Sequence, residues 1–177
     1  MISPSNIISS ERIQLIPCDE TLLNKIIEGD LSIGNHLGIS VAKGWSEFGV
    51  GPYEYTLRQI KGKPKDAKWW AYLLIHRIDQ KLIGGAGYKG PPGKRGMVEI
   101  GYGIAPEYRE KGYATEAAKA LIEHAFTFKE VKIIYAHTLA EKNASGSILK
   151  KLGFVFMEEV LDPEDGRLSR WGRAFRN

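Results

Sequence analysis

Apolar residues recur at the spacing of a helix in four parts of the chain. Between residues 114 and 126, alanines and larger apolar residues fill every third or fourth position, which places them on one helix face. Three shorter segments show the same spacing between a residue suited to begin a helix and a glycine suited to end it. The pattern predicts helices over residues 19–28, 52–60, 114–126 and 144–152.

Strand-forming residues dominate seven further segments of the chain, at residues 13–15, 69–76, 81–89, 98–104, 133–138, 154–161 and 168–175. The second and third segments are joined around Asp79 and Gln80, and the last two around Asp165 and Gly166. Each of these pairs is expected to form a hairpin. The segment from Asp30 to Gly51 has no clear periodicity and is expected to be irregular or weakly helical.

Strands and helices are mixed along the chain, as in an α/β or α+β fold. The length of 177 residues suits a single domain, expected to span residues 1–177. No apolar run approaches the length that crosses a bilayer, and the first ten residues lack the features of a secretory signal. Cys18 is the lone cysteine, so no internal disulfide can form. The default expectation is a cytoplasmic protein with no membrane partner.

The formal net charge of +4 and the isoelectric point near 9.1 favour an anionic partner. A polyphosphate cofactor satisfies this preference as well as a nucleic acid does. Arginines near the C-terminus stand at every third position, a spacing that on a strand distributes them over both faces. They are interpreted as solvated charges, which argues against a nucleic-acid surface: Arg167, Arg170, Arg173 and Arg176.

The most informative segment runs from Glu99 to Glu116, where a predicted strand leads through a short loop into the long predicted helix. Gly112 lets the main chain approach a ligand closely, and Ala114 keeps a large side chain away. The first amides of a helix have no intrahelical acceptor and lie at the positive end of the helix dipole. They can therefore bind a diphosphate. The alternative is a plain connection in which Gly112 only serves the turn.

The spacing Arg109-x-x-Gly112-x-Ala114 resembles the Q/R-x-x-G-x-G/A signature of the GNAT superfamily of acyl-CoA N-acyltransferases. Residues 99–116 look like the branch that includes ribosomal-protein N-terminal acetyltransferases (RimJ/RimL-like), and residues 142–154 look like the next helix of that branch. Two motifs at the expected separation are more specific than one. The resemblance is weakest between Asp30 and Lys68.

The resemblance implies a mixed, mostly antiparallel twisted sheet of about six to seven strands, flanked by about four helices. The sheet would splay open between the strand ending near Ile104 and the strand over 133–138, with acetyl-CoA in the opening. Main-chain groups near Ile104 would pair with the pantetheine arm of the cofactor. The residues implied around its diphosphate are Arg109, Lys111, Gly112, Tyr113, Ala114 and Thr115.

Asn143 or Ser145 would meet the cofactor beside the thioester. The family usually places an asparagine three residues before this serine, whereas Lys142 occupies that position and Asn143 follows it. Asn143 is alternatively a helix cap.

Acetylation of an amine needs a neutral nitrogen, a donor to the oxyanion and a proton for the departing thiolate. Glu99 is a candidate base, acting directly or through water; the alternative is an outward-facing surface glutamate. A main-chain N–H near Ile104 is the candidate oxyanion donor. Leu149 stands where many family members place an acidic tyrosine. Ser145 aligns with the serine proposed for that role in the ribosomal-protein branch, and alternatively bonds only to local backbone.

The expected acceptor is a primary amine, preferably a peptide or protein N-terminus that attacks acetyl-CoA directly in a ternary complex. An α-amino group has a pKa of about 7.7–8.0 against about 10.4 for lysine, so it is more readily neutral. Trp45, Trp70 and Tyr88 are candidates for lining its pocket, or else belong to the core. The alternatives are a small amine, such as a polyamine or an antibiotic-like compound, and a non-catalytic acyl-CoA sensor or RNA-docking module.

Two weaker patterns are discounted. The segment Gly85-Ala-Gly87-Tyr-Lys-Gly90 has the spacing of a dinucleotide-binding loop, but two prolines follow where that motif needs a helix. It is interpreted as a coincidence. The four histidines are scattered without a pair at metal-ligand spacing, so no metal is expected. A monomer and a homodimer are both compatible with the sequence.

Overall fold

The computed structural model describes residues 6–141 and 143–176, and one twisted sheet runs through them. Its nine strands lie in the order β1-β2-β4-β5-β6-β7-β9-β8, with β3 beside β5. The pairs β3–β5 and β6–β7 are parallel, and the other pairs are antiparallel. The strands are β1 (Ile8–Ser9), β2 (Ile13–Pro17), β3 (Ser40–Val41), β4 (Ala71–His76), β5 (Lys81–Tyr88), β6 (Met97–Ile104), β7 (Ile133–Leu139), β8 (Val155–Asp162) and β9 (Gly166–Ala174).

The predicted mixed and mostly antiparallel sheet is confirmed, but it has more strands than the six to seven expected. The two additional strands, β1 and β3, contain only two residues each. A strand of two residues is too short to show alternation, so it is defined by its pairing with β2 or β5 rather than by its own sequence.

Five α-helices lie within the described ranges: α1 (Glu20–Glu28), α2 (Asp30–Leu37), α3 (Gly51–Ile60), α4 (Tyr113–Ala125) and α5 (Ala144–Lys151). Short 3₁₀ helices cover Pro64–Trp69 and Pro106–Tyr108. Four of the α-helices match the predicted segments. Asp19, for example, caps α1 by accepting a hydrogen bond from the Leu22 amide at 2.8 Å. None of the described helices is long and apolar enough to cross a membrane.

The segment after Asp30, expected to be irregular or weakly helical, is helical in its first part, which forms α2. This helix has eight residues, and only Ile33 and Gly34 are buried in it. Gly29 at its N-terminus provides no side-chain cap. Such a helix has little stability of its own and forms because it packs against α1 and leads into β3.

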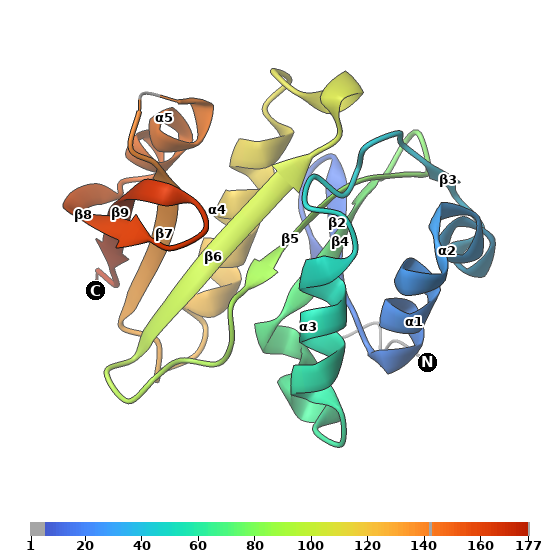
Figure 1. The fold of residues 1–177 in the computed structure, drawn as a ribbon, viewed down its shortest axis with the longest axis horizontal. Helices are drawn as coiled ribbons and strands as arrows, with labels where there is room; N and C mark the ends of the chain where they lie inside the picture. The colour runs from blue at the N-terminus through green and yellow to red at the C-terminus, as the bar shows by residue number, and fades with distance from the viewer. Residues whose placement is uncertain (1–5, 142, 177) are drawn as a thin grey trace.

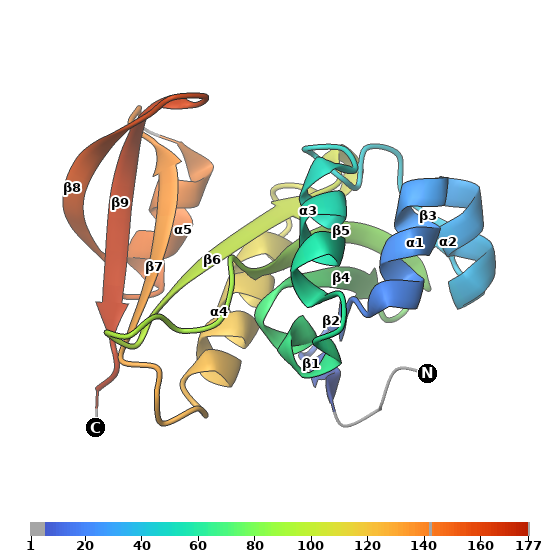
Figure 2. The ribbon, with the colours of Figure 1, turned by 60° about the horizontal axis from the view of Figure 1, so that its bottom comes forward.

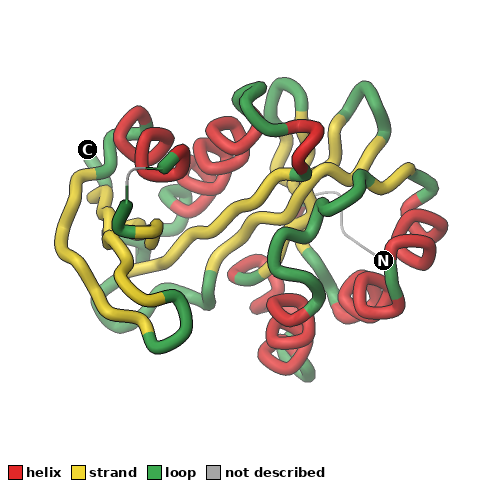
Figure 3. The backbone as a smooth tube through the Cα atoms, turned by 45° about the horizontal axis from the view of Figure 1, so that its top comes forward, coloured by secondary structure: helices red, strands yellow, loops and turns green. Residues whose placement is uncertain are grey.

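Helices cover both faces of the sheet. Figure 1 shows α3 in front of β5 and α4 behind β6, while α1 and α2 lie beyond the β3 side of the sheet. Figure 3 shows the strands passing between these groups of helices. Ala117, Leu121 and Ala125 of α4 are fully buried, which accounts for the strong apolar spacing of this helix.

The sheet opens between β6 and β7, as the resemblance to the GNAT superfamily implied. The two strands are paired only from Met97 to Glu99, where Glu99 lies opposite Tyr135. Beyond this point β6 stays paired with β5 up to Ile104, and β7 stays paired with β9 up to Leu139. Figure 2 shows the two strands diverging, so that a wedge separates the halves of the sheet.

Candidate active site

The backbone of β6 presents hydrogen-bonding groups to the wedge. The Lys89 amide donates to the Glu99 carbonyl at 3.0 Å, and the Ala105 amide donates to the Ile83 carbonyl at 2.8 Å. The odd-numbered positions therefore turn their main-chain groups toward β5. Because these groups alternate along a strand, Tyr102 and Ile104 turn theirs toward the wedge. An extended arm lying there can pair with them like an added strand.

The loop before α4 forms a concave group of amides. Glu110 and Gly112 both have positive φ angles, of 60° and 84°. The first backbone bond of the helix is donated by the Glu116 amide to the Gly112 carbonyl at 3.0 Å. Within the described ranges, the preceding amides donate to no acceptor: Lys111, Gly112, Tyr113, Ala114 and Thr115. We call these five amides the amide cradle, and their geometry suits an anion at a helix N-terminus.

The Arg109 amide was expected to lie beside the diphosphate of the cofactor, but it does not belong to the amide cradle. This amide already donates to the Pro106 carbonyl at 3.2 Å. The side chain instead points toward the end of β6, where Nε donates a hydrogen bond to the Ile104 carbonyl at 2.9 Å. The guanidinium also lies 3.8 Å from the Glu47 carboxylate. Arg109 thereby fixes the loop to the end of β6.

Arg12, from a distant part of the sequence, supports the amide cradle. Its guanidinium donates to the Lys111 carbonyl at 2.9 Å, pairs with Glu116 at 2.7 Å and lies 4.3 Å from the centre of the Tyr113 ring. A Cβ added at Gly112 would lie 3.3 Å from the same guanidinium. The positive charge of Arg12 is therefore fixed beside the first turn of α4, where it adds to the attraction for an anion. No local motif marks Arg12 in the sequence.

A buried histidine anchors the other side of this helix turn. The Asp79 amide donates to His76 Nδ1 at 3.0 Å, so the ring hydrogen is on Nε2, which lies 2.8 Å from the Tyr113 hydroxyl. The Tyr108 hydroxyl donates to the Asp79 carboxylate at 2.5 Å. These contacts tie both ends of the loop to the β4–β5 turn. Tyr113 therefore faces the cradle with its amide and the interior with its ring.

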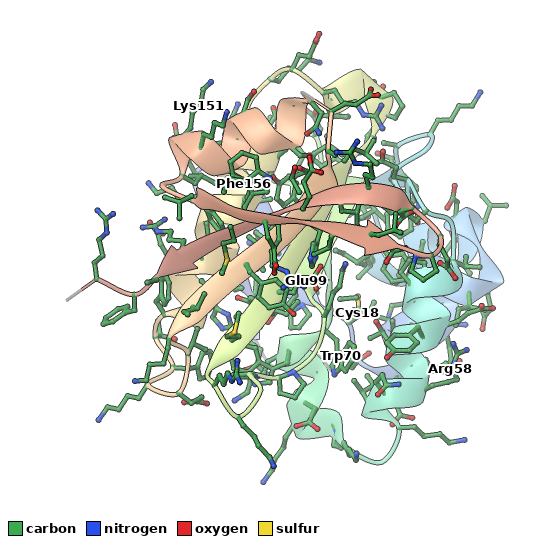
Figure 4. The ribbon with its side chains drawn as sticks, turned by 60° about the vertical axis from the view of Figure 1, so that its left-hand side comes forward. Cys18, Arg58, Trp70, Glu99, Lys151 and Phe156 are labelled. Carbon is green, nitrogen blue, oxygen red and sulfur yellow. The ribbon has the colours of Figure 1, made fainter. Side chains whose placement is uncertain are left out.

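Glu99 is largely buried at the point where β6 and β7 separate, and is not an outward-facing surface residue. Its side chain is 10% exposed, and Figure 4 places it in the middle of the molecule, between the β8–β9 hairpin and the side that carries Trp70. The carboxylate lies 2.6 Å from Lys89 Nζ and 2.9 Å from His137 Nδ1.

His137 links Glu99 to Arg170. Arg170 Nε donates to His137 Nε2 at 3.0 Å. An arginine N–H can only donate, so Nε2 is the acceptor and Nδ1 carries the hydrogen that is donated to Glu99. Arg170 also donates to Glu158 at 2.5 Å. The interpretation of Arg170 as a solvated charge was wrong, because its guanidinium holds the histidine beside Glu99.

The three aromatic residues predicted for the acceptor site border one pocket of about 620 Å³. Trp45, Trp70 and Tyr88 are 3%, 9% and 4% exposed, so they belong to the core and also line this pocket. Phe48 and Tyr55 form a far more exposed part of its wall. The pocket lies on the α3 side of β5 and β6, next to the wedge, and has the aromatic lining that ligand sites commonly have.

Glycines form the floor of this pocket. In the antiparallel pairing of β5 with β6, Gly85 lies opposite Gly103 and Gly87 lies opposite Gly101. A Cβ at Gly85 would lie 2.2 Å from the Tyr53 hydroxyl, whereas a Cβ at Gly101 would meet nothing within 4 Å. The glycine spacing that was discounted in the sequence is therefore explained by the pocket and not by a dinucleotide loop.

Tyr102 lies on β6 beyond the part that pairs with β7, and Ser145 lies in the first turn of α5. Burial raises the pKa of Tyr102 to about 12, and the neighbouring Ser145 hydroxyl lowers it in part. Within the described residues, the Tyr102 hydroxyl is nevertheless the one buried side-chain polar atom with no hydrogen-bond partner of good geometry. Tyr102 also borders the aromatic pocket. Sequence reasoning did not single it out.

The side chain of Asn143 acts as a helix cap. Its Oδ1 accepts a hydrogen bond from the Gly146 amide at 2.9 Å, and its Nδ2 donates to the carbonyls of Leu139 and Glu141. These bonds use the side chain locally, in the second of the two roles expected for it. Lys142, which precedes it, lies outside the described residues.

No group of three or more potential metal ligands occurs in the described part of the chain.

Comparison with known proteins agrees with this geometry. A family model described as an acetyltransferase (GNAT) domain matches residues 42–155. The uncharacterized N-acetyltransferase YjdG of Bacillus subtilis is 29% identical over 153 residues, which cover 84% of this chain and 89% of that protein.

Solved structures share the fold over nearly the whole chain. RimL, a ribosomal L7/L12 α-N-protein acetyltransferase in complex with coenzyme A, superimposes with a TM-score of 0.69 at 16% identity, covering 95% of this chain and 97% of that one. The microcin C7 self immunity acetyltransferase MccE, in complex with acetyl-CoA and AMP, gives a TM-score of 0.67 at 16% identity, with 98% of each chain covered. At such identities the likeness establishes the fold.

Proposed function

Because the chain belongs to the GNAT family and is an N-acetyltransferase, we propose that it transfers acetyl from acetyl-CoA to the α-amino group of a peptide or protein. The observation that carries the proposal is the aromatic pocket of about 620 Å³ directly beside the wedge between β6 and β7. The wedge suits the acyl donor and the pocket suits the residue that bears the amine.

The amide cradle would hold the diphosphate of acetyl-CoA. Five amides without acceptors, with the Arg12 guanidinium beside them, match two phosphate groups in charge and in hydrogen-bonding capacity. Arg109 would hold the loop before α4 against the end of β6 through its hydrogen bond to the Ile104 carbonyl. Main-chain groups of Tyr102 and Ile104 would pair with the pantetheine arm, and Ser145, with Asn143 as the cap of its helix, would lie near the thioester.

The acceptor side chain would enter the pocket lined by Trp45, Trp70 and Tyr88. These walls favour an apolar or aromatic first residue, and the exposed Phe48 and Tyr55 allow the following residues of a peptide to leave toward solvent. The carboxylate of Glu47 also lines the pocket and attracts an ammonium group. RimL, which shares the fold, is an α-N-protein acetyltransferase.

In the reaction, the amine nitrogen attacks the thioester carbonyl carbon, the oxyanion accepts a hydrogen bond from an amide of β6 near Ile104, and the carbon–sulfur bond then breaks. Glu99 would take the amine proton through a water molecule, since its carboxylate already binds Lys89 and His137. Ser145 would donate the proton to the departing sulfur.

The second candidate acceptor is a small amine, because the pocket volume lies within the range of small-molecule sites. MccE, which has the same fold, is a microcin C7 self immunity acetyltransferase. Phe48 and Tyr55 discriminate between the two acceptors, since they would contact the second and third residues of a peptide but little of a small amine.

The test measures release of CoA thiol with a panel of acceptors. It compares peptides with a free N-terminus and different first residues, the same peptides with a blocked N-terminus and an internal lysine, and polyamines. The expected result is the highest kcat/KM for free N-termini that begin with an apolar or aromatic residue. A higher kcat/KM for polyamines, or equal values for free and blocked peptides, would contradict the proposal.

A further inference from the structure

A second cavity lies beside the aromatic pocket and differs from it in charge. Its volume is about 360 Å³, and its walls are the β5–β6 loop, the first residues of β6 and Tyr135 of β7. We call it the basic cavity, because its charged lining consists of three cations and one carboxylate: Lys89, Lys94, Arg95 and Glu99.

Two of these cations are not neutralised by the protein itself. The Glu99 carboxylate lies 2.6 Å from Lys89 Nζ and accepts a hydrogen bond from His137, so its charge already has partners. Lys94 and Arg95 take part in none of the ion pairs among the described residues. Both are exposed. The basic cavity therefore offers positive charge to an anion that arrives from outside.

The backbone of the loop fixes the place of these two cations. The Gly96 amide donates to the Gly93 carbonyl at 2.8 Å, which makes Lys94 and Arg95 the central residues of a tight turn. The Gly96 carbonyl in turn accepts a hydrogen bond from the Lys132 amide at 2.8 Å, just before β7. Because the turn is anchored on both sides, an anion that binds has to order only side chains.

The basic cavity continues from the aromatic pocket, and Lys89 lines both. Trp70 connects their walls. The centre of its ring lies 5.8 Å from that of Tyr55, and a Cβ added at Gly90 would lie 3.5 Å from the other edge of the indole. Tyr55 belongs to the wall along which the later residues of a bound peptide would leave. A peptide that follows this wall therefore reaches the β5–β6 loop.

We propose that the basic cavity binds a carboxylate of the acceptor, so that the enzyme prefers peptides with aspartate or glutamate after the first residue. The inference rests on the proposed function, because it adds a second contact to the acceptor whose amine lies at the wedge. A planar carboxylate can accept two parallel hydrogen bonds from the Arg95 guanidinium and a further one from Lys94 Nζ. The same two charges repel a polycation, so they select against polyamines.

Matched pairs of peptides test this preference. The two members of a pair share an apolar first residue and differ by aspartate or asparagine at one later position, and each has an amidated C-terminus. At the preferred position, aspartate is expected to lower the KM about five- to tenfold at low ionic strength, with kcat nearly unchanged. The gain should disappear in about 1 M salt, where the screening length is about 3 Å. Equal KM values for aspartate and asparagine at every position would overturn the proposal.

Two double variants assign the preference to the basic cavity. Lys94→Gln with Arg95→Gln should abolish the gain from aspartate and leave the KM for the asparagine peptides unchanged. Lys119→Gln with Lys129→Gln removes the same charge from exposed positions that do not line the cavity, so it should keep the gain. All four side chains are exposed, and both variants should melt like the wild type. A gain that survives the first variant, or is lost equally in both, would contradict the proposal.

A small-amine comparison separates this inference from the proposed peptide acceptor. The α-amides of glutamate and glutamine carry the same amine and differ in a side-chain carboxylate. If the enzyme acetylates small amines better than peptides, the proposed acceptor is wrong, and the glutamate compound is then expected to have the lower KM. Loss of that difference in the Lys94→Gln and Arg95→Gln double variant would support the basic cavity. Equal KM values for the two compounds would overturn it in that case.

Discussion

Glu116 is the residue on which the start of α4 depends most directly. Its carboxylate accepts hydrogen bonds from the Ser10 hydroxyl, the Arg12 amide and the Arg12 guanidinium, each at 2.7 Å. Burial alone would raise the pKa of Glu116, but these hydrogen bonds outweigh burial and lower the pKa below its usual 4.5. The ionised carboxylate therefore stabilises the folded state, and with it the amide cradle.

This shift predicts a dependence of stability on acid. A carboxyl group whose pKa is lowered by folding stabilises the fold fully above its unfolded pKa, and this contribution is lost as the pH falls through the folded value. Glu116→Gln should therefore lower stability by about 1–3 kcal/mol at pH 7, and this difference should shrink as the pH falls below 4.5 through the lowered pKa. Thermal melts between these pH values test it. Glu123→Gln, an exposed position on the same helix, is the control, and parallel curves for Glu116→Gln and wild type would contradict the prediction.

At the scale of elements, glycines on β5 and β6 leave room for the aromatic pocket that we propose binds the acceptor. Gly85 lies opposite Gly103, and Gly87 lies opposite Gly101, so one face of this strand pair carries no side chains beneath α3. The sequence displays the glycines, but their common purpose depends on the register of two strands. That register is a tertiary property, which explains why the sequence analysis could interpret the spacing only as a coincidence.

Gly101→Val tests the pocket without disturbing the fold. A Cβ at Gly101 meets nothing within 4 Å, its φ is not in the left-handed region, and valine favours a strand, so stability should hold or rise by up to about 1 kcal/mol. The side chain would occupy the pocket, and the acceptor KM should rise about tenfold or more while acetyl-CoA affinity stays unchanged. Steady-state kinetics with both substrates measure this. An unchanged acceptor KM would place the acceptor elsewhere.

The elements also show which parts of the molecule the sequence could predict. The strand, loop and helix from Glu99 to Glu116 are contiguous, so the spacing of Gly112 and Ala114 already indicated an anion site. The helix α2 carries only a weak apolar pattern, so the sequence left its segment as either irregular or weakly helical. Arg12 supports the cradle through Glu116, which is 104 residues away in the sequence, and no local signal can reveal such a partner.

At the scale of the molecule, the sheet consists of two halves that share only the β6–β7 pairing from Met97 to Glu99. The half with β6 contains Tyr102 and leads into the amide cradle, and the half with β7 contains His137 and leads into Ser145. A donor bound in the wedge would contact both halves. Its binding should therefore stabilise the whole fold, and not only the loop that holds its phosphates.

Mass action gives the size of this stabilisation. The free energy of unfolding should rise by about 2.7 kcal/mol when coenzyme A is present at 100 times its dissociation constant. Gly112→Ala should reduce it, because alanine at a φ of 84° is strained and its Cβ approaches Arg12. Gly166→Ala is the matched control, since Gly166 has a φ of 76° at the β8–β9 turn with open space around it. Both variants should lose about 1–2 kcal/mol of intrinsic stability from left-handed strain. Only Gly112→Ala should lose the coenzyme-dependent rise in melting temperature, and equal rises in both variants would place the diphosphate away from the start of α4.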